Sequence, residues 1–234
     1  MTLSDDLPDD QTLYQIDGVD LVVPRAMVTP PLAEVLSTGR YEHLEARAMS
    51  KSLRREDRVL EIGAGVGFLA ILAARIVGQG AVTAVEANPD LVPVLHGNLT
   101  RNGVGGARVV HGAVSPPGSP ETIAFFARRA FWAGSTDERG KGGETKIDVP
   151  AWTLADLLDV SEATFLVMDI EGAEEHLFDA PLPEHLRRII VELHPNRYGS
   201  AGVARVFQGA LGSGFAYAPD GSRGKVVVFE RVDP

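Results

Sequence analysis

Cysteine is absent from all 234 residues of this chain. That absence excludes disulfides, thiolate metal sites and a cysteine nucleophile together. A basic excess is missing too, because 32 Asp and Glu residues oppose 22 Lys and Arg residues and give a formal net charge of −10. A chain of this charge is poorly suited to hold a polyanion, so we expect no nucleic acid as its main partner.

Long apolar runs are also missing. The longest, Val66 to Ala74, ends at Arg75 and is too short to span a bilayer, so no membrane partner is expected. Residues 1–10 carry four aspartates and no basic–apolar pattern, so they do not resemble a signal peptide, and we expect a cytoplasmic protein. We interpret residues 1–10 as a disordered acidic tail and residues 11–234 as a single domain with an N-terminal extension over 11–55.

A strand, a glycine turn and a helix form the most informative stretch. The apolar residues of 59–62 predict a strand and those of 68–77 predict a helix, and Gly63, Gly65 and Gly67 lie between them. Glycine permits positive φ and lets a ligand lie against the main chain, while the following helix directs its N–H groups at that ligand. This pattern predicts a nucleotide-binding unit, and a tight turn that holds no ligand is the alternative.

Two acidic residues indicate which nucleotide this unit would hold. Dinucleotide dehydrogenases favour G-x-G-x-x-G, whereas here Glu61 stands two positions before the first glycine of G-x-G-x-G. A carboxylate there suits a cationic ligand end better than a pyrophosphate, and S-adenosylmethionine has such an end in its α-amino and sulfonium groups. Glu86 ends the next predicted strand, 19 positions after Gly67, where a carboxylate can accept hydrogen bonds from both ribose hydroxyls.

The remaining pattern alternates strands and helices. It predicts an α/β, Rossmann-like fold with a mostly parallel seven-stranded sheet, helices on both faces and a C-terminal antiparallel hairpin. An Asp17-Gly18 turn predicts an additional N-terminal β-hairpin over 14–23. We also expect an added strand over 123–127 and a glycine-rich, charged surface loop over 133–146.

Acidic and histidine residues gather at the predicted strand ends, where ligands bind in an open parallel sheet. We expect His194 to act as the acid or base, with Glu192 fixing its tautomer, although a purely structural role for this histidine stays open. Asp169 is expected to hold the cofactor amino group or to orient an acceptor hydroxyl. Glu171 and Glu174 can instead be helix N-terminal carboxylates, and for Glu174 we favour that interpretation. A metal held by Asp169, Glu192 and His194 is conceivable, but none is expected.

Seven stretches, in the same order, resemble the FkbM family of S-adenosylmethionine-dependent methyltransferases, a class I family that mostly methylates oxygen. Met168 departs from the family pattern, because such proteins often carry lysine before the strand-end aspartate. The matching stretches are Gly39-x-Tyr41-Glu42, Val59 to Gly67, Val85 to Pro89, Gly112 to Ser115, Trp152 to Leu158, Asp169 to Glu174 and Glu192-x-His194.

The resemblance implies a class I methyltransferase domain that uses S-adenosylmethionine and methylates a hydroxyl of a small molecule, sugar or natural product. Trp132 and Glu171 are the expected substrate residues, although Trp132 can equally be a packed hydrophobic anchor. The catalytic residues expected are His194, Glu192 and Asp169, and those for the cofactor are Glu42, Glu61, Gly63, Gly65, Gly67, Glu86, Ala87, Ala113 and Asp169.

Two other functions stay open at this point. One is an NAD-dependent oxidoreductase on a similar sheet, and the other is a non-catalytic scaffold that still binds the cofactor. The expected partner is a small-molecule or glycan acceptor, and a homodimer stays open as the assembly.

Overall fold

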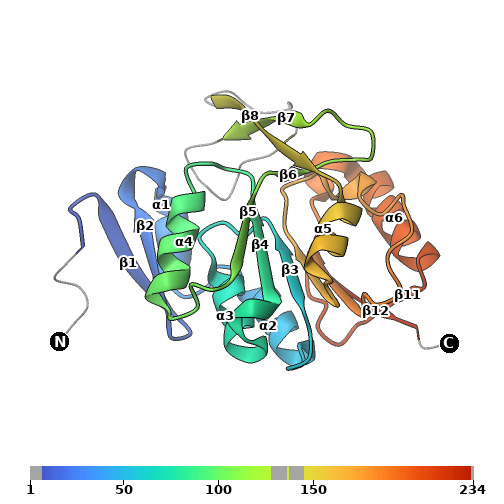
Figure 1. The fold of residues 1–234 in the computed structure, drawn as a ribbon, viewed down its shortest axis with the longest axis horizontal. Helices are drawn as coiled ribbons and strands as arrows, with labels where there is room; N and C mark the ends of the chain where they lie inside the picture. The colour runs from blue at the N-terminus through green and yellow to red at the C-terminus, as the bar shows by residue number, and fades with distance from the viewer. Residues whose placement is uncertain (1–6, 128–135, 137–144, 233–234) are drawn as a thin grey trace.

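A seven-stranded sheet forms the centre of the computed structural model, which describes residues 7–127, 136 and 145–232 (Figure 1). Its strand order is β11–β12–β10–β9–β3–β4–β5. β12 runs antiparallel to both of its neighbours, β11 and β10, whereas β10, β9, β3, β4 and β5 pair in parallel. The strands are β3 (Val59–Ile62), β4 (Val82–Glu86), β5 (Arg108–His111), β9 (Phe165–Met168), β10 (Arg188–Glu192), β11 (Phe215–Tyr217) and β12 (Val226–Arg231).

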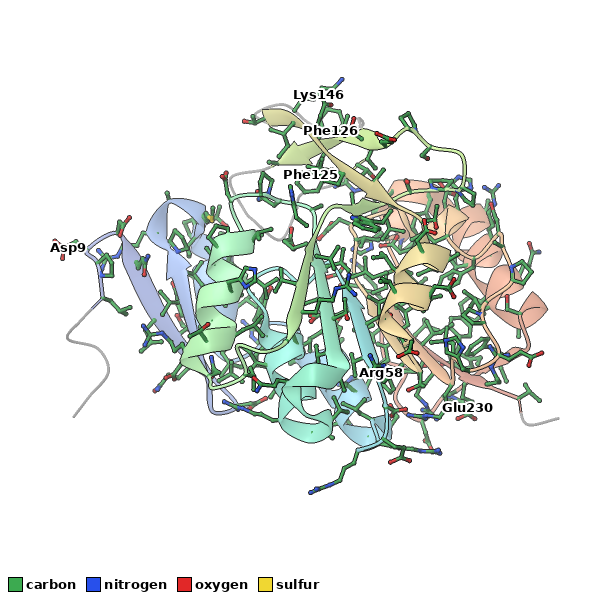
Figure 2. The ribbon with its side chains drawn as sticks, viewed as in Figure 1. Asp9, Arg58, Phe125, Phe126, Lys146 and Glu230 are labelled. Atoms are coloured by element: carbon green, nitrogen blue, oxygen red, sulfur yellow. The ribbon has the colours of Figure 1, made fainter. Side chains whose placement is uncertain are left out.

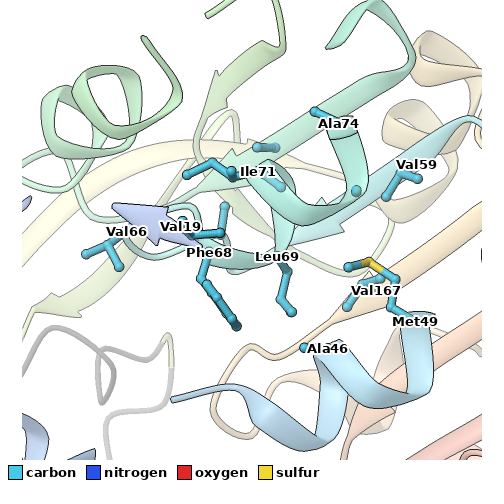
Figure 3. Packing of buried hydrophobic residues seen from close by; sticks show 14 of the residues in the cluster. Val19, Ala46, Met49, Val59, Val66, Phe68, Leu69, Ile71, Ala74 and Val167 are labelled. Atoms are coloured by element: carbon cyan, nitrogen blue, oxygen red, sulfur yellow. The ribbon is translucent and has the colours of Figure 1, made fainter. Parts of the chain in front are cut away.

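Helices cover both faces of the sheet because its central strands are apolar on both sides. β3, β4 and β9 are buried along their whole length. On one face lie α2 (His43–Ser52), α3 (Phe68–Val77) and α4 (Val92–Arg101), and Figure 3 shows Ala46 and Met49 of α2 near Leu69 of α3. On the other face lie α5 (Leu154–Ser161) and α6 (Pro195–Gly212). The predicted fold class is therefore confirmed.

The N-terminal hairpin is also present, as β1 (Gln11–Ile16) and β2 (Val19–Pro24). Its turn residues Asp17 and Gly18 have φ of 48° and 74°, the left-handed pair that a two-residue hairpin turn needs. Asn98 of α4 fixes the hairpin, because its side chain accepts a hydrogen bond from the N–H of Val22 and donates one to the carbonyl of the same residue. α1 (Pro30–Ser37) follows and leads into α2.

A second, three-stranded sheet of order β6–β8–β7 lies beyond the carboxyl end of β5. Its strands are β6 (Ala113–Val114), β7 (Thr122–Ala127) and β8 (Thr145–Trp152). β7 agrees with the expected strand, but the expected loop is wrong at its end, because Thr145 and Lys146 pair with β7 in β8. β8 was missed because Pro150 and the charged residues Lys146 and Asp148 interrupt its short alternation of Ile147, Val149 and Ala151. The other residues of that expected loop, except Thr136, lie outside the described residues up to 144.

At the amino-terminal ends of the parallel strands, one buried carboxylate links several segments of the chain. Figure 2 shows Arg58 and Glu230 at this end of the sheet, far from Phe125 and Lys146 of the small sheet. Asp57 is 3% exposed and accepts hydrogen bonds from the Arg187 guanidinium, the Thr164 hydroxyl and the Arg54 N–H. Burial by itself would raise the pKa of Asp57, but these donors outweigh it, and the pKa lies below its ordinary value.

Among the described residues, no helix combines the length and the hydrophobicity that crossing a membrane requires.

The Asp57 network predicts a stability change. We expect Asp57→Ala to lower the free energy of unfolding by about 3 kcal/mol, because it leaves the partly buried Arg187 guanidinium without its counter-ion. Urea denaturation measures this change. Glu34→Ala is the matched control, since it removes the exposed ion pair with Arg40 and should leave the unfolding midpoint unchanged. Equal effects from both variants would contradict the importance of the buried network.

Candidate functional site

A cavity of about 360 Å³ opens at the carboxyl ends of the parallel strands. It is lined by the segment before and within α2, by the glycine turn after β3, and by residues that follow β4, β5 and β9. Among the residues expected at the site, those that line this cavity are Glu42, Gly63, Gly65, Glu86, Ala87, Ala113, Asp169, Glu171 and Glu192. Glu61, Gly67 and His194 do not line it, and Trp132 lies outside the described residues.

The glycine turn brings main chain, without side chains, to the cavity floor. Gly63 has a φ of +87°, and a Cβ there would lie 1.9 Å from the carbonyl oxygen of Asp169. Gly67 has a φ of +93° at the start of α3, where a Cβ would lie 2.6 Å from Leu95 of α4. Gly63 therefore permits the close approach of two strand ends, whereas Gly67 permits helix packing beneath the cavity.

Glu86 lies at the end of β4 with both carboxylate oxygens fixed. One oxygen accepts a hydrogen bond of 2.7 Å from the Gly65 N–H, and the other accepts one of 2.7 Å from the Asn88 N–H. Burial raises the pKa of Glu86 to about 7, and these N–H groups limit the rise. Each carboxylate oxygen can accept more than one hydrogen bond, so Glu86 can still receive two hydroxyls from the cavity.

Two further carboxylates are buried near the floor without full pairing. Glu61 is 2% exposed, and neither of its oxygens has a hydrogen-bond partner among the described residues. Burial, followed by the charge of Glu86, raises the pKa of Glu61 well above its ordinary value. Glu42, in the left-handed conformation with a φ of 47°, has one buried oxygen without a partner, and burial followed by the charge of Glu61 raises its pKa as well. A cationic ligand group would relieve this uncompensated negative charge.

A second group of titratable residues, here called the His194 cluster, consists of Asp169, Glu171, Glu174 and His194. His194 Nδ1 lies 3.0 Å from Glu174 Oε1, and Nε2 lies 3.6 Å from Asp169 Oδ1 and 3.7 Å from Glu171 Oε2. Glu174 is fully buried, and the same Oε1 accepts hydrogen bonds from the N–H groups of Ile170 and Gly172.

The hydrogen-bond partner of His194 differs from the sequence-based expectation. Glu192 was expected to fix the ring, but β10 ends at Glu192, so strand alternation does not extend to His194, which precedes α6. Glu174 holds the ring instead. It does begin a short 3-10 helix (Glu174–His176), as expected, but its carboxylate is also part of the site. The spacing in Asp169-x-Glu171-x-x-Glu174 singles out these acids, yet the sequence contains no sign of which one meets the histidine.

The charges of the His194 cluster act on one another. Burial would lower the pKa of His194, but the hydrogen bond and charge of Glu174, followed by the charges of Glu171 and Glu192, raise it. The pKa of Asp169 is raised well above its ordinary value by burial and by the charges of Glu192 and Glu171. Glu192 thus contributes through its charge, with Lys225 Nζ at 4.0 Å from its carboxylate.

The residues present fit S-adenosylmethionine. Gly63 and Gly65 present main chain to the cavity, and Glu86 offers acceptor positions for a ribose diol. The Glu42 oxygen that has no partner among the described residues matches a cationic end, and the charge of buried Glu61 lies behind it. Ala87 and Ala113 add small apolar surface to the cavity wall, where a purine ring can pack.

Comparisons with known proteins agree with this choice of cofactor. A family model described as a methyltransferase FkbM domain matches residues 61–215. The chain is 37% identical over 107 residues to a protein-L-isoaspartate O-methyltransferase of Methanoculleus marisnigri, covering 44% of each chain. It is 37% identical over 100 residues to a ribosomal protein L11 methyltransferase of Pelotomaculum thermopropionicum, covering 42% of this chain and 31% of that protein.

The chain therefore spans less than half the length of these two curated relatives. Among solved structures, M. jannaschii TYW2 in complex with AdoMet superposes with a TM-score of 0.50 at 17% identity, covering 97% of this chain and 89% of that chain. This likeness shows the shared fold.

The close approach at Gly63 predicts that a side chain there would lower stability and prevent ligand binding. We expect Gly63→Ala to lower the melting temperature and to prevent binding of S-adenosylhomocysteine, because its Cβ would displace the Asp169 carbonyl. Differential scanning fluorimetry and calorimetric titration measure both effects. Gly97→Ala in α4 is the matched control, since no atom lies within 4 Å of its added Cβ and alanine favours the helix by up to about 1 kcal/mol. Normal ligand binding by Gly63→Ala would contradict the role of the glycine turn in holding the cofactor.

The pKa of Glu86 predicts a pH dependence of nucleoside binding. We expect 5′-methylthioadenosine, which lacks the amino acid portion, to bind about tenfold more weakly at pH 6 than at pH 8. With a pKa of about 7, Glu86 is mostly protonated at the lower pH and mostly ionised at the higher pH. Calorimetric titration measures the change, and Glu86→Gln should bind with little pH dependence. The same pH profile in that variant would show that another group is responsible.

Proposed function

Because the family match covers more than half of it, this chain belongs to the methyltransferase FkbM family, and we propose that it transfers the methyl group of S-adenosylmethionine to a hydroxyl oxygen. The acceptor class is a small molecule, a sugar or a natural product. The observation that carries the proposal is the placement of Glu86, the Gly63 turn and Asp169 around one cavity. We further propose that residues 11–234 form one methyltransferase domain, with the extension of 11–55 contributing Glu42 to that cavity.

The cofactor, when bound, supplies an electrophilic methyl group on a sulfonium. Glu86 would accept the two ribose hydroxyls, and its own hydrogen bonds from Gly65 and Asn88 hold the carboxylate in place for this task. Glu42, Glu61 and Asp169 would balance the charge of the amino acid end. Glu61 is buried, and Glu42 and Asp169 are partly buried, which strengthens this match because electrostatic attraction is less screened where water is excluded.

The acceptor would occupy the part of the cavity next to Glu171 and Glu192. Methyl transfer needs the acceptor oxygen, the methyl carbon and the sulfur in line, so these side chains mainly position the acceptor. The hydroxyl proton would leave toward the His194 cluster. His194 is the member of that cluster expected to receive it, because Glu174 holds Nδ1 and thereby turns Nε2 toward Asp169 and Glu171.

Two variants separate cofactor binding from turnover. We expect Glu86→Ala to weaken S-adenosylhomocysteine binding about 10- to 100-fold, because hydrogen bonds to a charged group are lost. We expect His194→Ala to lower kcat about 100- to 10,000-fold while the dissociation constant of S-adenosylhomocysteine stays within about twofold of the parent. Calorimetry measures binding, and transfer of an isotope-labelled methyl group to a panel of hydroxylated sugars and natural products measures turnover.

Three outcomes of that assay would contradict the proposal. These are tighter binding of NAD than of S-adenosylhomocysteine, methyl transfer to nitrogen instead of oxygen, and unchanged cofactor affinity in Glu86→Ala. Peptide and protein acceptors belong in the same panel, because one relative is named for a ribosomal protein.

A further inference from the structure

The His194 cluster carries an inference that methyl transfer does not require. Its ring nitrogen Nε2 lies near two carboxylates, yet at 3.6 and 3.7 Å it is too far for a hydrogen bond to either. If the ring were simply an imidazolium donating its proton, one of these distances would contract to about 2.8 Å. The observed separations need another explanation.

Two ligands of one metal ion have such a separation. With each donor about 2.1 Å from the ion and ligand–metal–ligand angles of about 90–120°, the donor atoms are about 3.0–3.6 Å apart, close to the two distances at Nε2. One donor atom each from Asp169, Glu174 and His194 also lies within 4.8 Å of the other two. Imidazole and carboxylate donors are therefore grouped together at this point of the fold.

The other side of the imidazole ring supports the same conclusion. A metal-ligating histidine almost always donates its second ring N–H to a carboxylate or carbonyl, which fixes the tautomer and leaves the other nitrogen free to bind the ion. His194 Nδ1 meets Glu174 Oε1 at 3.0 Å, and Glu174 is held in turn by the N–H groups of Ile170 and Gly172. These contacts hold the ring so that Nε2 is left to face a ligand.

Unsatisfied polar atoms lie around the ring. The His194 side chain is 9% exposed, and no hydrogen bond to its Nε2 is found among the described residues. In the same part of the chain, Asp169 Oδ1 is buried without a hydrogen-bond partner. Burying such atoms unpaired is costly, and a bound cation would satisfy them.

The charge balance also favours a cation. Glu45, Asp169, Glu171 and Glu192 all line the cavity. The cationic groups beside them are the His194 imidazole, the Arg197 guanidinium, whose stem is close to Gly172, and the Lys225 ammonium, 4.0 Å from Glu192. These three groups face five carboxylates when Glu174 is included, so the site retains a negative excess.

We propose that the His194 cluster binds one divalent transition-metal ion, of the class of Mn²⁺ or Zn²⁺, through His194 Nε2 and the carboxylate of Asp169. Glu171 supplies a third oxygen, and Glu174 orients the imidazole from behind. A mixed nitrogen and carboxylate donor set suits these ions. Asp169 and Glu171 line the cavity, so the open coordination positions face the acceptor side.

The ion and the acceptor proton would use the same nitrogen. His194 is therefore the proton acceptor in the metal-free protein and a ligand in the loaded protein, where the ion would lower the pKa of a bound acceptor hydroxyl. The residue types alone predicted no metal, and the pairing of His194 with Glu174 is what changes that inference.

Calorimetric titration of tag-free, EDTA-treated protein with MnCl₂ and with ZnCl₂ tests the proposal, and the electron paramagnetic resonance spectrum of Mn²⁺ gives an independent readout. We expect saturable binding of one ion per chain without S-adenosylmethionine. His194→Ala and Asp169→Asn should each weaken this binding at least tenfold. Glu174→Gln should weaken it about 10- to 100-fold, because the imidazole loses the carboxylate that orients it.

His176→Ala is the matched control. His176 has carboxylate oxygens of Glu175 and Asp179 at 3.5 Å, but it is 45% exposed and the Arg205 guanidinium contacts both ring nitrogens. That cation would repel a metal, so this variant should bind the ion like the parent. Binding of S-adenosylhomocysteine and the melting temperature show whether each variant is folded.

Two results would overturn the proposal. One is the absence of saturable binding of either ion by the parent protein at millimolar concentration. The other is equal affinity in the parent and in folded His194→Ala or Asp169→Asn. Neither result bears on methyl transfer, because His194 is the proposed proton acceptor in the metal-free protein, so turnover by EDTA-treated protein tests the proposed function separately from the cation site.

Discussion

The close contact between the glycine turn and the end of β9 is the constraint on which the site depends. Ile62 pairs with Met168, and the Asp169 N–H donates to the Ile62 carbonyl, so the two strands leave the sheet side by side. Gly63 then passes so near the Asp169 carbonyl that no side chain fits. This contact places the nucleotide cradle and the His194 cluster at one opening, and a shift of either strand would separate them.

Uncompensated negative charge is the second property of this opening. The sheet collects buried carboxylates at its carboxyl edge, and burial together with mutual repulsion raises the pKa of Glu42, Glu61 and Asp169. At the amino-terminal ends of the same strands, hydrogen-bond donors lower the pKa of Asp57 instead. That carboxylate is paired within the protein and supports the fold, whereas the carboxylates at the carboxyl ends depend on protons or on cationic ligands.

The fold was largely predictable because its signals are local. Apolar runs predicted β3, β4 and α3, and the Asp17-Gly18 turn predicted the first hairpin. β8 was missed because its pairing with β7 is long-range and its apolar residues are separated by Lys146, Asp148 and Pro150.

The site was predictable in part for the same reason. Strand ends located Glu86 and Asp169, which do line the cavity. The partner of His194 was not predictable, because it depends on how the segment after β9 turns back, through the left-handed conformations of Glu171 and Gly172, to bring Glu174 under the ring. Neither residue periodicity nor spacing encodes that turn.

The small sheet has a consequence for how the two halves of the cavity can change. It is one continuous segment between β5 and α5, it contributes Phe125 to the wall, and its two ends are joined by the hydrogen bond from the Ser115 N–H to the Trp152 carbonyl. Insertions between those joined ends would alter the wall without disturbing the register of the seven strands. Ala113 of β6 belongs to the cofactor side, but the rest of this wall can diverge while the cofactor floor is kept, so that one scaffold could serve acceptors of different size.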